Sequence, residues 1–524
     1  MTPASGPRMR PQPHEVLVAV VLLALAFAPL VGLLIRVRTN GGVVTGGDGF
    51  LVADPLQYLT WLREASHTIA VENLYDLRGG PHSFVHPGVV AAGLLHLAGL
   101  GLVASYAVFK PVAVVALVAG AAAICRRFLD RPSDQALALV LALFFASPLA
   151  ALVGWAGIGD QGTKYQFDFV SGELWSGTYL WGYVFTGIAV GLMPLALLAY
   201  ERGRAGGSRR WLAACAGGGL LSAWLQPWQG ITLVLILVAA ELVCVRRGHR
   251  VRDVVADLIG PVVAVAVPLT YYLALSKLDE SWTLAGQIND FPRWPWYVTV
   301  LGLAPLALPA LFAYRLPAPD WGAIALRVWP LAGLVVFYQP LGTFPFHAFQ
   351  GLTIPLSVMA LMAVRHALGE RRLSPIAAVA AVLVLCVVGT AYRANELREA
   401  VVLERQPFLL DAGERDALRY MEAAEGKGGV LTPVYSGIVV PAYTGRETWI
   451  GAGSWTPDFE RRRQLTEKLF GGRMPARQAR AVVRGSGARF LYVDCHGRGD
   501  IGPSVRAFTD PPRRFGCASV YRVR

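Results

Sequence analysis

The segment that decides the fold is the polar stretch GGDGFLVADPLQYLTWLREASHTIAVENLYDLRGGPHSFVHPG, residues 46–88, which interrupts an otherwise very hydrophobic chain. It follows an apolar run from Val16 to Ile35, roughly 20 residues and long enough to cross a bilayer. A long polar loop directly after a first membrane segment indicates a function for that loop. This loop carries two aspartates, Asp48 and Asp54. We interpret it as the loop that holds the reacting groups of an enzyme.

The composition indicates a polytopic α-helical membrane protein. Of the 524 residues, 54% are hydrophobic and only 16% are charged, whereas a soluble chain carries about 25% charged residues. Long apolar runs recur as far as Tyr392, as expected for helices that span a bilayer. The net charge of +13 does not indicate a nucleic-acid partner, because the arginines cluster in short loops between apolar runs, where positive charge fixes topology.

The apolar runs predict about 11 transmembrane helices. The first is 16–35, and the others are 105–124, 136–153, 180–199, two short helices within 211–250, 254–275, 296–314, 326–338, 352–364 and 375–392. The segment 89–102 is too short to span and is expected to be juxtamembrane or re-entrant. Arg8 and Arg10 precede the first helix, and the short Arg-rich loops fall on the same side, which predicts a cytoplasmic amino terminus. The first loop, 36–104, is then outside the cytoplasm.

The chain is predicted to divide into a transmembrane domain, 1–393, and a smaller domain, 394–524. Helix-like and strand-like patterns alternate in the tail, which predicts a small α/β domain. The topology puts this domain outside the cytoplasm. Cys495 follows one strand-like segment and Cys517 precedes another. In an oxidising compartment these two cysteines could form a disulfide or remain free.

Asp54 has two compatible interpretations. The sequence Asp54-Pro55-Leu56-Gln57 has the features of a helix start, with an aspartate at the N-cap and a proline at the first helical position. The helix that follows is amphipathic and would lie on the membrane surface. A rigid helix start could also hold a carboxylate at the mouth of a cavity, where it deprotonates a hydroxyl or amide acceptor. Asp48, in a Gly-rich turn, is either a turn residue or a second candidate base.

Short motifs give the chain a resemblance to a known superfamily. The sequence DPLQYL from Asp54, the stretch Glu72–Tyr75, His86-Pro87 and the tail segment VVPAYTGRETWIGAGSWTPDFERRR, residues 439–463, are similar to the GT-C superfamily. Its members are polytopic glycosyltransferases that use polyprenyl-phosphate sugars. The nearest resemblance is to a bacterial group related to the dolichyl-phosphate-mannose-dependent protein mannosyltransferases.

The resemblance implies that Asp54 is the general base, with Asp48 as a second candidate. Many members carry a pair of acidic residues at this position, whereas this chain has Ala53-Asp54-Pro55. Any requirement for a divalent metal is therefore open, and no metal ligand set is predicted.

Five residues are candidates for substrate binding. Lys110, near the outward end of the second span, could bind the donor phosphate or could snorkel to the interface. His347, where relatives often have arginine, could bind phosphate or be structural. Arg393, just past the last span, could bind phosphate or anchor the helix at the interface. Glu173 lies in an aromatic-rich loop that suits either a sugar or an interface belt.

The fifth candidate is His86, for which a structural role in the loop is the alternative. His82 and His86 flank a Ser-Phe-Val run, and no carboxylate or third histidine has a spacing that fits metal ligation.

The predicted reaction transfers a hexose or pentose from a polyprenyl phosphate, with inversion, to an acceptor outside the cytoplasm of a bacterial plasma membrane. The acceptor could be a lipid, a glycan or a protein. Lys110 or His347 would stabilise the leaving phosphate. The alternatives are a transporter or flippase of lipid-linked glycans and a non-catalytic scaffold that contacts membrane lipids and a partner. We find no internal repeat of the kind that transporters often show.

Overall fold

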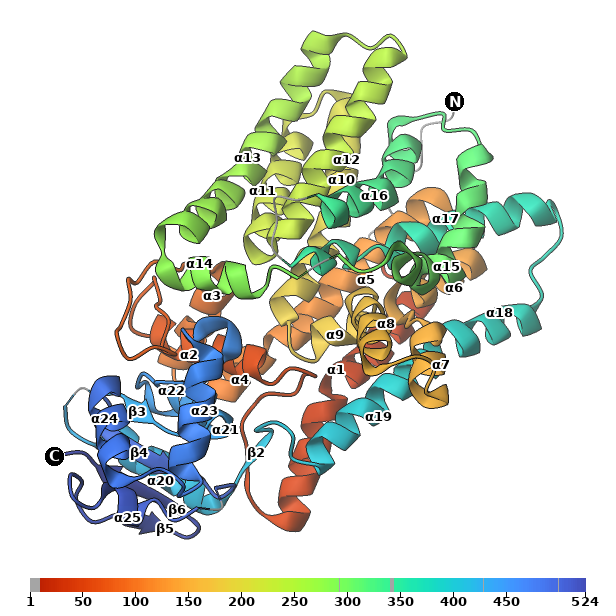
Figure 1. Cartoon of the computed structure of the whole chain (residues 1–524). Helices are drawn as coiled ribbons and strands as arrows, with labels where there is room; N and C mark the ends of the chain where they lie inside the picture. Colours follow the sequence, from red (N-terminus) through yellow and green to blue (C-terminus); the bar gives the residue numbers. More distant parts are fainter. Residues whose placement is uncertain (1–9, 292, 340–343, 427, 498) are drawn as a thin grey trace.

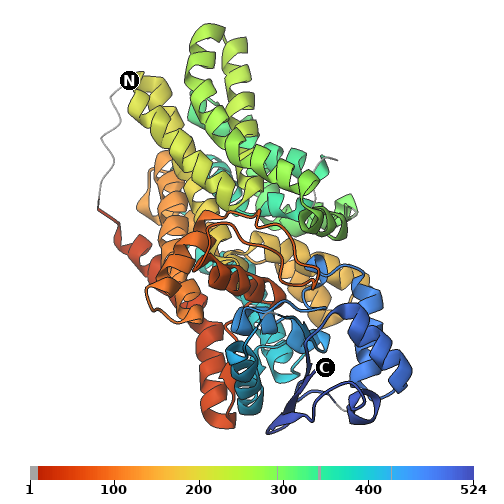
Figure 2. The same ribbon diagram turned by 90° about the vertical axis from the view of Figure 1, so that its left-hand side faces the viewer.

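A computed structural model describes residues 10–524 except 292, 340–343, 427 and 498. Arg8, used above to predict the topology, lies outside the described residues. In both views the C-terminal domain lies at one end of a helical bundle, next to the first loop (Figures 1 and 2). The polar segment 46–88 therefore lies between the helical bundle and the C-terminal segment.

Nine helical segments of the described residues are long and apolar enough to cross a membrane. They contain α1 (Pro13–Asn40), α4 (Leu102–Ala107) with α5 (Phe109–Phe128), α10 (Val184–Gly206), α12 (Pro227–Arg246), α13 (Val251–Leu278), α15 (Trp296–Phe312) with η1 (Ala313–Arg315), α16 (Trp321–Tyr338), η2 (Pro345–Phe349) with α17 (Thr353–Leu368), and α18 (Pro375–Val382) with η3 (Leu383–Val387) and α19 (Val388–Val402). A tenth span results if α6 (Pro132–Phe144) and α7 (Pro148–Ala156), which are bent by 44°, cross together.

The helix pattern follows the prediction with one difference in number. The region 211–250 forms two helices as predicted, because Pro227 begins α12 directly after α11 (Arg209–Leu225) ends. At 17 residues, α11 is too short to count among the nine, so the described residues give nine or ten spans rather than about 11. The predicted juxtamembrane segment 89–102 overlaps α3 (Pro87–Leu97), whose 11 residues are too few to span.

Helix α2 (Ala53–Ala65) lies inside the protein and not on the membrane surface as predicted. Leu56, Leu59 and Leu62 are almost fully buried, and α2 packs against α3 on one side and α22 (Val440–Thr444) of the C-terminal part on the other. These contacts with other parts of the chain remove the leucines from solvent. The remaining short helices near this end are α8 (Gln161–Leu174), α9 (Ser176–Leu180) and α14 (Glu280–Ile288).

The C-terminal part contains a mixed sheet covered by short helices. Helix α19 runs through residue 393 to Val402, so the boundary at 393 remains a prediction. The further elements are β2 (Leu409–Leu410), α20 (Ala412–Ala423), β3 (Val430–Leu431), α21 (Val434–Gly437), η4 (Gly453–Trp455), α23 (Phe459–Phe470), α24 (Ala476–Ser486), β4 (Phe490–Val493), α25 (Gly502–Val505), β5 (Arg513–Phe515) and β6 (Ala518–Arg522). The strand order is β3-β4-β6-β5, with β3 and β4 parallel and the other pairs antiparallel. Cys495 and Cys517 form a disulfide.

Backbone pairing and ion pairs attach the C-terminal part to the first loop. Strand β1 (Val43–Val44) pairs antiparallel with β2. Asp76 of the first loop accepts hydrogen bonds from the Arg462 guanidinium of α23, with 3.1 Å between the charged atoms. A continuous set of buried apolar side chains extends from the bundle through α2 into the C-terminal part. The first loop is therefore held from both sides.

Candidate active site

Asp54 lies in the first turn of α2 and does not cap the helix as predicted. The cap position is Val52, whose amide donates to Oε1 of Gln406 at 2.7 Å. The amide of Asp54 itself donates to the Leu51 carbonyl at 3.1 Å. Because a side chain from the C-terminal part satisfies the helix start, the Asp54 carboxylate is not used for capping. Its Oδ2 accepts a hydrogen bond from the Tyr183 hydroxyl at 2.5 Å.

The surroundings of Asp54 suit a general base. Its side chain is half-buried, and this burial raises the pKa of Asp54 above its ordinary value, while the Tyr183 hydrogen bond and the nearby His347 act in the opposite direction. A carboxylate with a raised pKa takes a proton more readily than an exposed one, and perturbed carboxylates are typical of functional sites. His347 is hundreds of positions away from Asp54 in the sequence, yet the fold brings it close enough to act on the charge of Asp54.

His347 belongs to a polar network at the end of α8. Its Nδ1 lies 3.1 Å from Oε2 of Glu173, and this contact is an ion pair when the ring carries a second proton. The amide nitrogen of Gln350 donates to the same carboxylate oxygen at 2.8 Å. Gln226 donates in turn to Oε1 of Gln350 at 2.9 Å. The predicted residues His347 and Glu173 are thus in direct contact and are held in place by two glutamines.

Arg393 of α19 reaches the same end of α8. Its guanidinium lies over the ring of Phe50, 5.1 Å from the centroid, and one of its terminal nitrogens donates to the Asp168 carbonyl. A Cβ added to Gly172 would lie 2.6 Å from that guanidinium nitrogen. Gly172 directly precedes Glu173, so Arg393 and the His347–Glu173 pair lie at neighbouring positions. The other terminal nitrogen of Arg393 donates to Oε2 of Glu396 at 2.9 Å. Arg393 and His347 therefore lie at the same end of α8, and His347 is the one that acts on Asp54.

Asp48 and Lys110 form a buried ion pair with each other. Lys110 Nζ lies 2.7 Å from Oδ2 of Asp48, and the two side chains are only 2% and 3% exposed. The ammonium group also donates to the carbonyls of Ala26 and Leu180. With these partners both groups are satisfied inside the protein. Their predicted roles as a second base and a phosphate ligand remain predictions, and their contacts favour a structural role.

His86 caps helix α3. Its Nδ1 accepts a hydrogen bond from the Val89 amide at 3.2 Å, and its Nε2 lies 3.5 Å from the Leu225 carbonyl. Burial lowers the pKa of His86 to about 4, so the ring is neutral at physiological pH. The predicted contact of His86 with substrate remains a prediction, and the structural alternative has these contacts in its favour.

One group of side chains could hold a divalent cation. Nε2 of His82 lies 3.1 Å from Oε1 of Glu64 and 3.8 Å from Oε1 of Glu72. The sequence spacing does not predict this group. An antiparallel contact between Val71 and Phe84 folds the loop back and brings the two carboxylates to His82. Burial and the charge of Glu72 raise the pKa of Glu64 to about 8. A histidine with two carboxylates matches the ligand types of Zn²⁺. Glu64 lies about 15 Å along α2 from Asp54 by helix rise, so such an ion would not contact the candidate base.

Tyr183 and Gln350 belong to the candidate site although no sequence pattern indicates them. Tyr183 stands in an aromatic stretch at the start of the predicted span 180–199, and that position is typical of a membrane interface belt. Gln350 lies in a turn with no motif of its own. The hydrogen bonds that give both residues a role join segments far apart in the chain, and periodicity carries no signal for such contacts.

Solved structures resemble the whole chain. ArnT from Cupriavidus metallidurans, bound to undecaprenyl phosphate, matches with a TM-score of 0.54 and 13% identity over 97% of each chain. The oligosaccharyltransferase AglB from Archaeoglobus fulgidus, in complex with an inhibitory peptide and a dolichol-phosphate, matches with a TM-score of 0.53 and 13% identity over 94% of this chain and 72% of AglB. Both are GT-C glycosyltransferases that act with polyprenyl-phosphate-linked sugars. The chain has a GT-C fold.

A third match gives the same fold. The mycobacterial arabinofuranosyltransferase AftD, also of the GT-C class, matches with a TM-score of 0.51 and 15% identity over 97% of this chain and 41% of AftD. No protein-family model matches the chain, and no curated protein matches it by sequence. The GT-C resemblance predicted from the first loop is confirmed at the level of the fold, and the chain is a multi-pass membrane protein of that architecture.

Proposed function

We propose that the chain is a glycosyltransferase that moves a hexose or pentose from a polyprenyl-phosphate donor to an acceptor on the extracytoplasmic side of a bacterial plasma membrane. The observation that carries the proposal is the Asp54 carboxylate, which is free of capping, raised in pKa by burial and close to His347. The GT-C fold supports it, because related structures hold undecaprenyl phosphate and dolichol-phosphate.

In the proposed step Asp54 accepts the proton of an acceptor hydroxyl as the hydroxyl oxygen attacks the anomeric carbon. The bond between that carbon and the phosphate oxygen breaks, and its electron pair leaves with the polyprenyl phosphate. Attack from the face opposite the phosphate inverts the anomeric centre. Protonated His347 and Arg393 would stabilise the charge that develops on the leaving phosphate.

The buried Asp48–Lys110 pair takes no part in this proposed step. Lys110 already has a carboxylate and two carbonyls as partners, and releasing it toward a phosphate would leave Asp48 buried and unpaired. We assign the pair to attachment of the first loop to the bundle. A transporter of lipid-linked glycans is the alternative function, and the glycosyltransferase neighbours favour the enzyme.

The test is transfer of a radiolabelled sugar by protein reconstituted in proteoliposomes. Asp54→Asn keeps the size of the side chain but removes the base, so transfer should fall about 10²-fold or more while the protein still folds. Asp290→Asn is the matched control, because Asp290 is an exposed aspartate in another loop, and it should keep full activity. Near-normal transfer by Asp54→Asn would rule out Asp54 as the base.

A further inference from the structure

Three side chains of the first loop come together at the end of α2. Nε2 of His82 lies 3.1 Å from Oε1 of Glu64 and 3.8 Å from Oε1 of Glu72. The ligand atoms of the three residues all lie within 4.8 Å of one another. Glu64 belongs to the last turn of α2, whereas Glu72 and His82 lie on the polar segment that follows it. We call these three residues the His82 cluster.

The separations within the His82 cluster suit a Zn²⁺ ion. Zn²⁺ binds imidazole nitrogen and carboxylate oxygen at about 2.0–2.2 Å in a tetrahedral arrangement, so its ligand atoms lie about 3.3–3.6 Å apart. The two distances from Nε2 of His82, 3.1 and 3.8 Å, lie on either side of that range. Ca²⁺ and Mg²⁺ prefer six or more oxygen ligands. A nitrogen with two carboxylate oxygens therefore favours Zn²⁺, with water in the fourth position.

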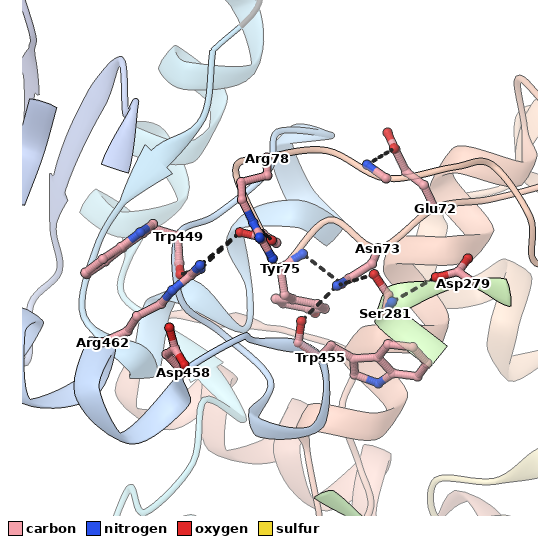
Figure 3. Close-up of polar contacts among 12 residues, drawn as sticks. Glu72, Asn73, Tyr75, Arg78, Asp279, Ser281, Trp449, Trp455, Asp458 and Arg462 are labelled. Carbon is pink, nitrogen blue, oxygen red and sulfur yellow. Dashed lines mark hydrogen bonds and ion pairs between the residues drawn. The ribbon is translucent and has the colours of Figure 1, made fainter. Parts of the chain in front are cut away.

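Backbone amides hold both carboxylates in place. The Glu72 amide donates to Oε1 and to Oε2 of Glu64, at 3.1 Å in each case. The Gly80 amide donates to Oε2 of Glu72 at 3.2 Å (Figure 3), which leaves Oε1 of Glu72 on the side of His82. Such hydrogen bonds orient ligating carboxylates before an ion binds and are typical of metal sites.

The chain on each side of Glu72 is also fixed. Val71, the residue before it, forms an antiparallel contact with Phe84, two residues after the histidine of the cluster. Nδ2 of Asn73, the residue after it, donates to the Trp455 carbonyl of the C-terminal part at 2.8 Å (Figure 3). Contacts outside the His82 cluster therefore bring its ligands together, and their approach does not depend on an ion.

The His82 cluster carries more negative charge than its surroundings neutralise. Within the described ranges, no lysine or arginine forms an ion pair with either of its carboxylates. Arg63, the nearest arginine in the sequence, pairs instead with Glu422. Arg78 pairs with Asp76. The two glutamate side chains of the cluster are only 13% and 16% exposed, so water screens their repulsion incompletely, and one divalent cation would neutralise both.

The histidine gives an ion a way into the cluster, because the His82 side chain is 50% exposed. Within the part of the chain that the structure describes, one further group has the donor types of a metal site, and it consists of Asp411, Cys495 and Cys517. The two sulfurs of that group form a disulfide and offer no thiolate. The His82 cluster is therefore the group whose ligand atoms are able to bind an ion.

We propose that Glu64, Glu72 and His82 bind one Zn²⁺ ion, which ties the end of α2 to residues 72–84, the part of the first loop that folds back. The role of the ion is structural. Glu64 lies about 15 Å along α2 from Asp54 by helix rise, so the ion would not contact the proposed base. The proposal is independent of the proposed function, since metal binding requires no transfer reaction.

The experiment measures Zn²⁺ binding by the full chain without a histidine tag, in detergent, after removal of metals with a chelator. Titration with zinc chloride against a chromogenic zinc indicator gives the affinity and the stoichiometry, and tryptophan fluorescence on heating gives the unfolding temperature. One Zn²⁺ per chain should bind saturably. The unfolding temperature should rise by a few degrees at saturating Zn²⁺, because the ion binds the folded state, and Mg²⁺ should leave it unchanged.

Two variants each remove one ligand. Glu72→Gln and His82→Ala should weaken Zn²⁺ binding about tenfold or more, since even the loss of a residue that only supports a metal ligand costs about 10–100-fold in affinity. The rise in unfolding temperature with Zn²⁺ should disappear in both. Without Zn²⁺, Glu72→Gln should unfold no earlier than the wild type, because it removes the repulsion between the carboxylates, and this result separates lost binding from lost folding.

The matched controls are His67→Ala, which changes an exposed histidine of the same loop, and Glu425→Gln, which changes an exposed glutamate of the C-terminal part. Both should bind Zn²⁺ like the wild type. The proposal is overturned if no Zn²⁺ binds saturably, or if Glu72→Gln and His82→Ala bind it with wild-type affinity. An equal rise in unfolding temperature with Mg²⁺ would overturn the assignment of the site to Zn²⁺.

Discussion

At the scale of single residues, the account depends on how Asp54 is held. The carboxylate lies at the start of a helix but is not part of its cap, because Gln406 takes the amide that precedes the helix. The only hydrogen bond to its side chain among the described residues comes from Tyr183. This bond stabilises the ionised carboxylate and partly offsets the effect of burial on the pKa of Asp54.

Removal of the Tyr183 hydroxyl should therefore move the pH dependence of transfer. In Tyr183→Phe the carboxylate loses a stabilising donor, so the pKa of Asp54 rises further. A general base works only when ionised, and activity is lost as pH falls through its pKa. The acid limb of kcat/KM should shift upward by about one to two pH units, since a hydrogen bond to a charged group contributes about 1.5–3 kcal/mol. Activity at high pH should be largely retained.

The control for this measurement is Tyr297→Phe, which changes a half-exposed tyrosine at the start of α15. Its profile should match the wild type. An unchanged acid limb in Tyr183→Phe would contradict the assignment of Asp54 as the ionising group.

At the scale of elements, α2 shows what the sequence could and could not predict. The DPLQ motif correctly predicted a helix beginning near Asp54, whereas the functional role of the polar loop remains a prediction. The sequence pattern predicts that this helix lies on the membrane surface. The structure buries it instead, and the residues that bury it belong to α3 and α22, which the local pattern does not identify. The prediction that Asp54 caps the helix is wrong for the same reason: the group that binds the amide at the helix start is Gln406, which lies 354 residues from Val52. Local propensity describes a helix well but does not identify distant partners.

The buried ion pair between Asp48 of the first loop and Lys110 of α5 gives a prediction about the stability of the protein. Lys110→Met would leave the Asp48 carboxylate buried without a cation, and loss of one partner of a buried pair costs about 3–5 kcal/mol. The thermal unfolding temperature in detergent should fall markedly. The double variant Lys110→Met with Asp48→Asn should recover much of the loss, because no buried charge remains.

The same variants distinguish the two interpretations of Lys110. If Lys110 served mainly to bind the donor phosphate, Lys110→Met would keep wild-type stability and lose donor affinity. Wild-type stability in that variant would therefore contradict the structural assignment of the ion pair.

At the scale of the whole molecule, the GT-C fold was predictable from motifs and layout, whereas the candidate site was predictable only in part. Sequence patterns predicted Asp54, His347, Glu173 and Arg393 as four separate candidates and gave no sign of which of them are in contact. The contacts of His347 and Arg393 with the end of α8 depend on how η2 and α19 pack against it, which no pattern encodes. The pairing of Asp48 with Lys110 and the cluster of Glu64 with His82 were missed for the same reason.

The attachment of the C-terminal part to the first loop predicts that the two lie on one side of the membrane. Because β1 pairs with β2 and the Arg-rich loops favour the cytoplasm, an alkaline phosphatase fused after Arg524 should be active in a bacterial host. A fusion after Arg127, at the end of α5, should be inactive and should fluoresce when the reporter is green fluorescent protein. The reverse pattern would place the proposed reaction in the cytoplasm.

The most direct test of the central claim is a cryo-EM structure of the full chain in nanodiscs with a non-hydrolysable polyprenyl-phosphate sugar. The account predicts that the phosphate lies within ion-pair reach of His347 and Arg393 and that the anomeric carbon faces Asp54, with the Asp48–Lys110 pair intact. A donor whose phosphate binds Lys110 instead, or whose sugar lies away from Asp54, would contradict it.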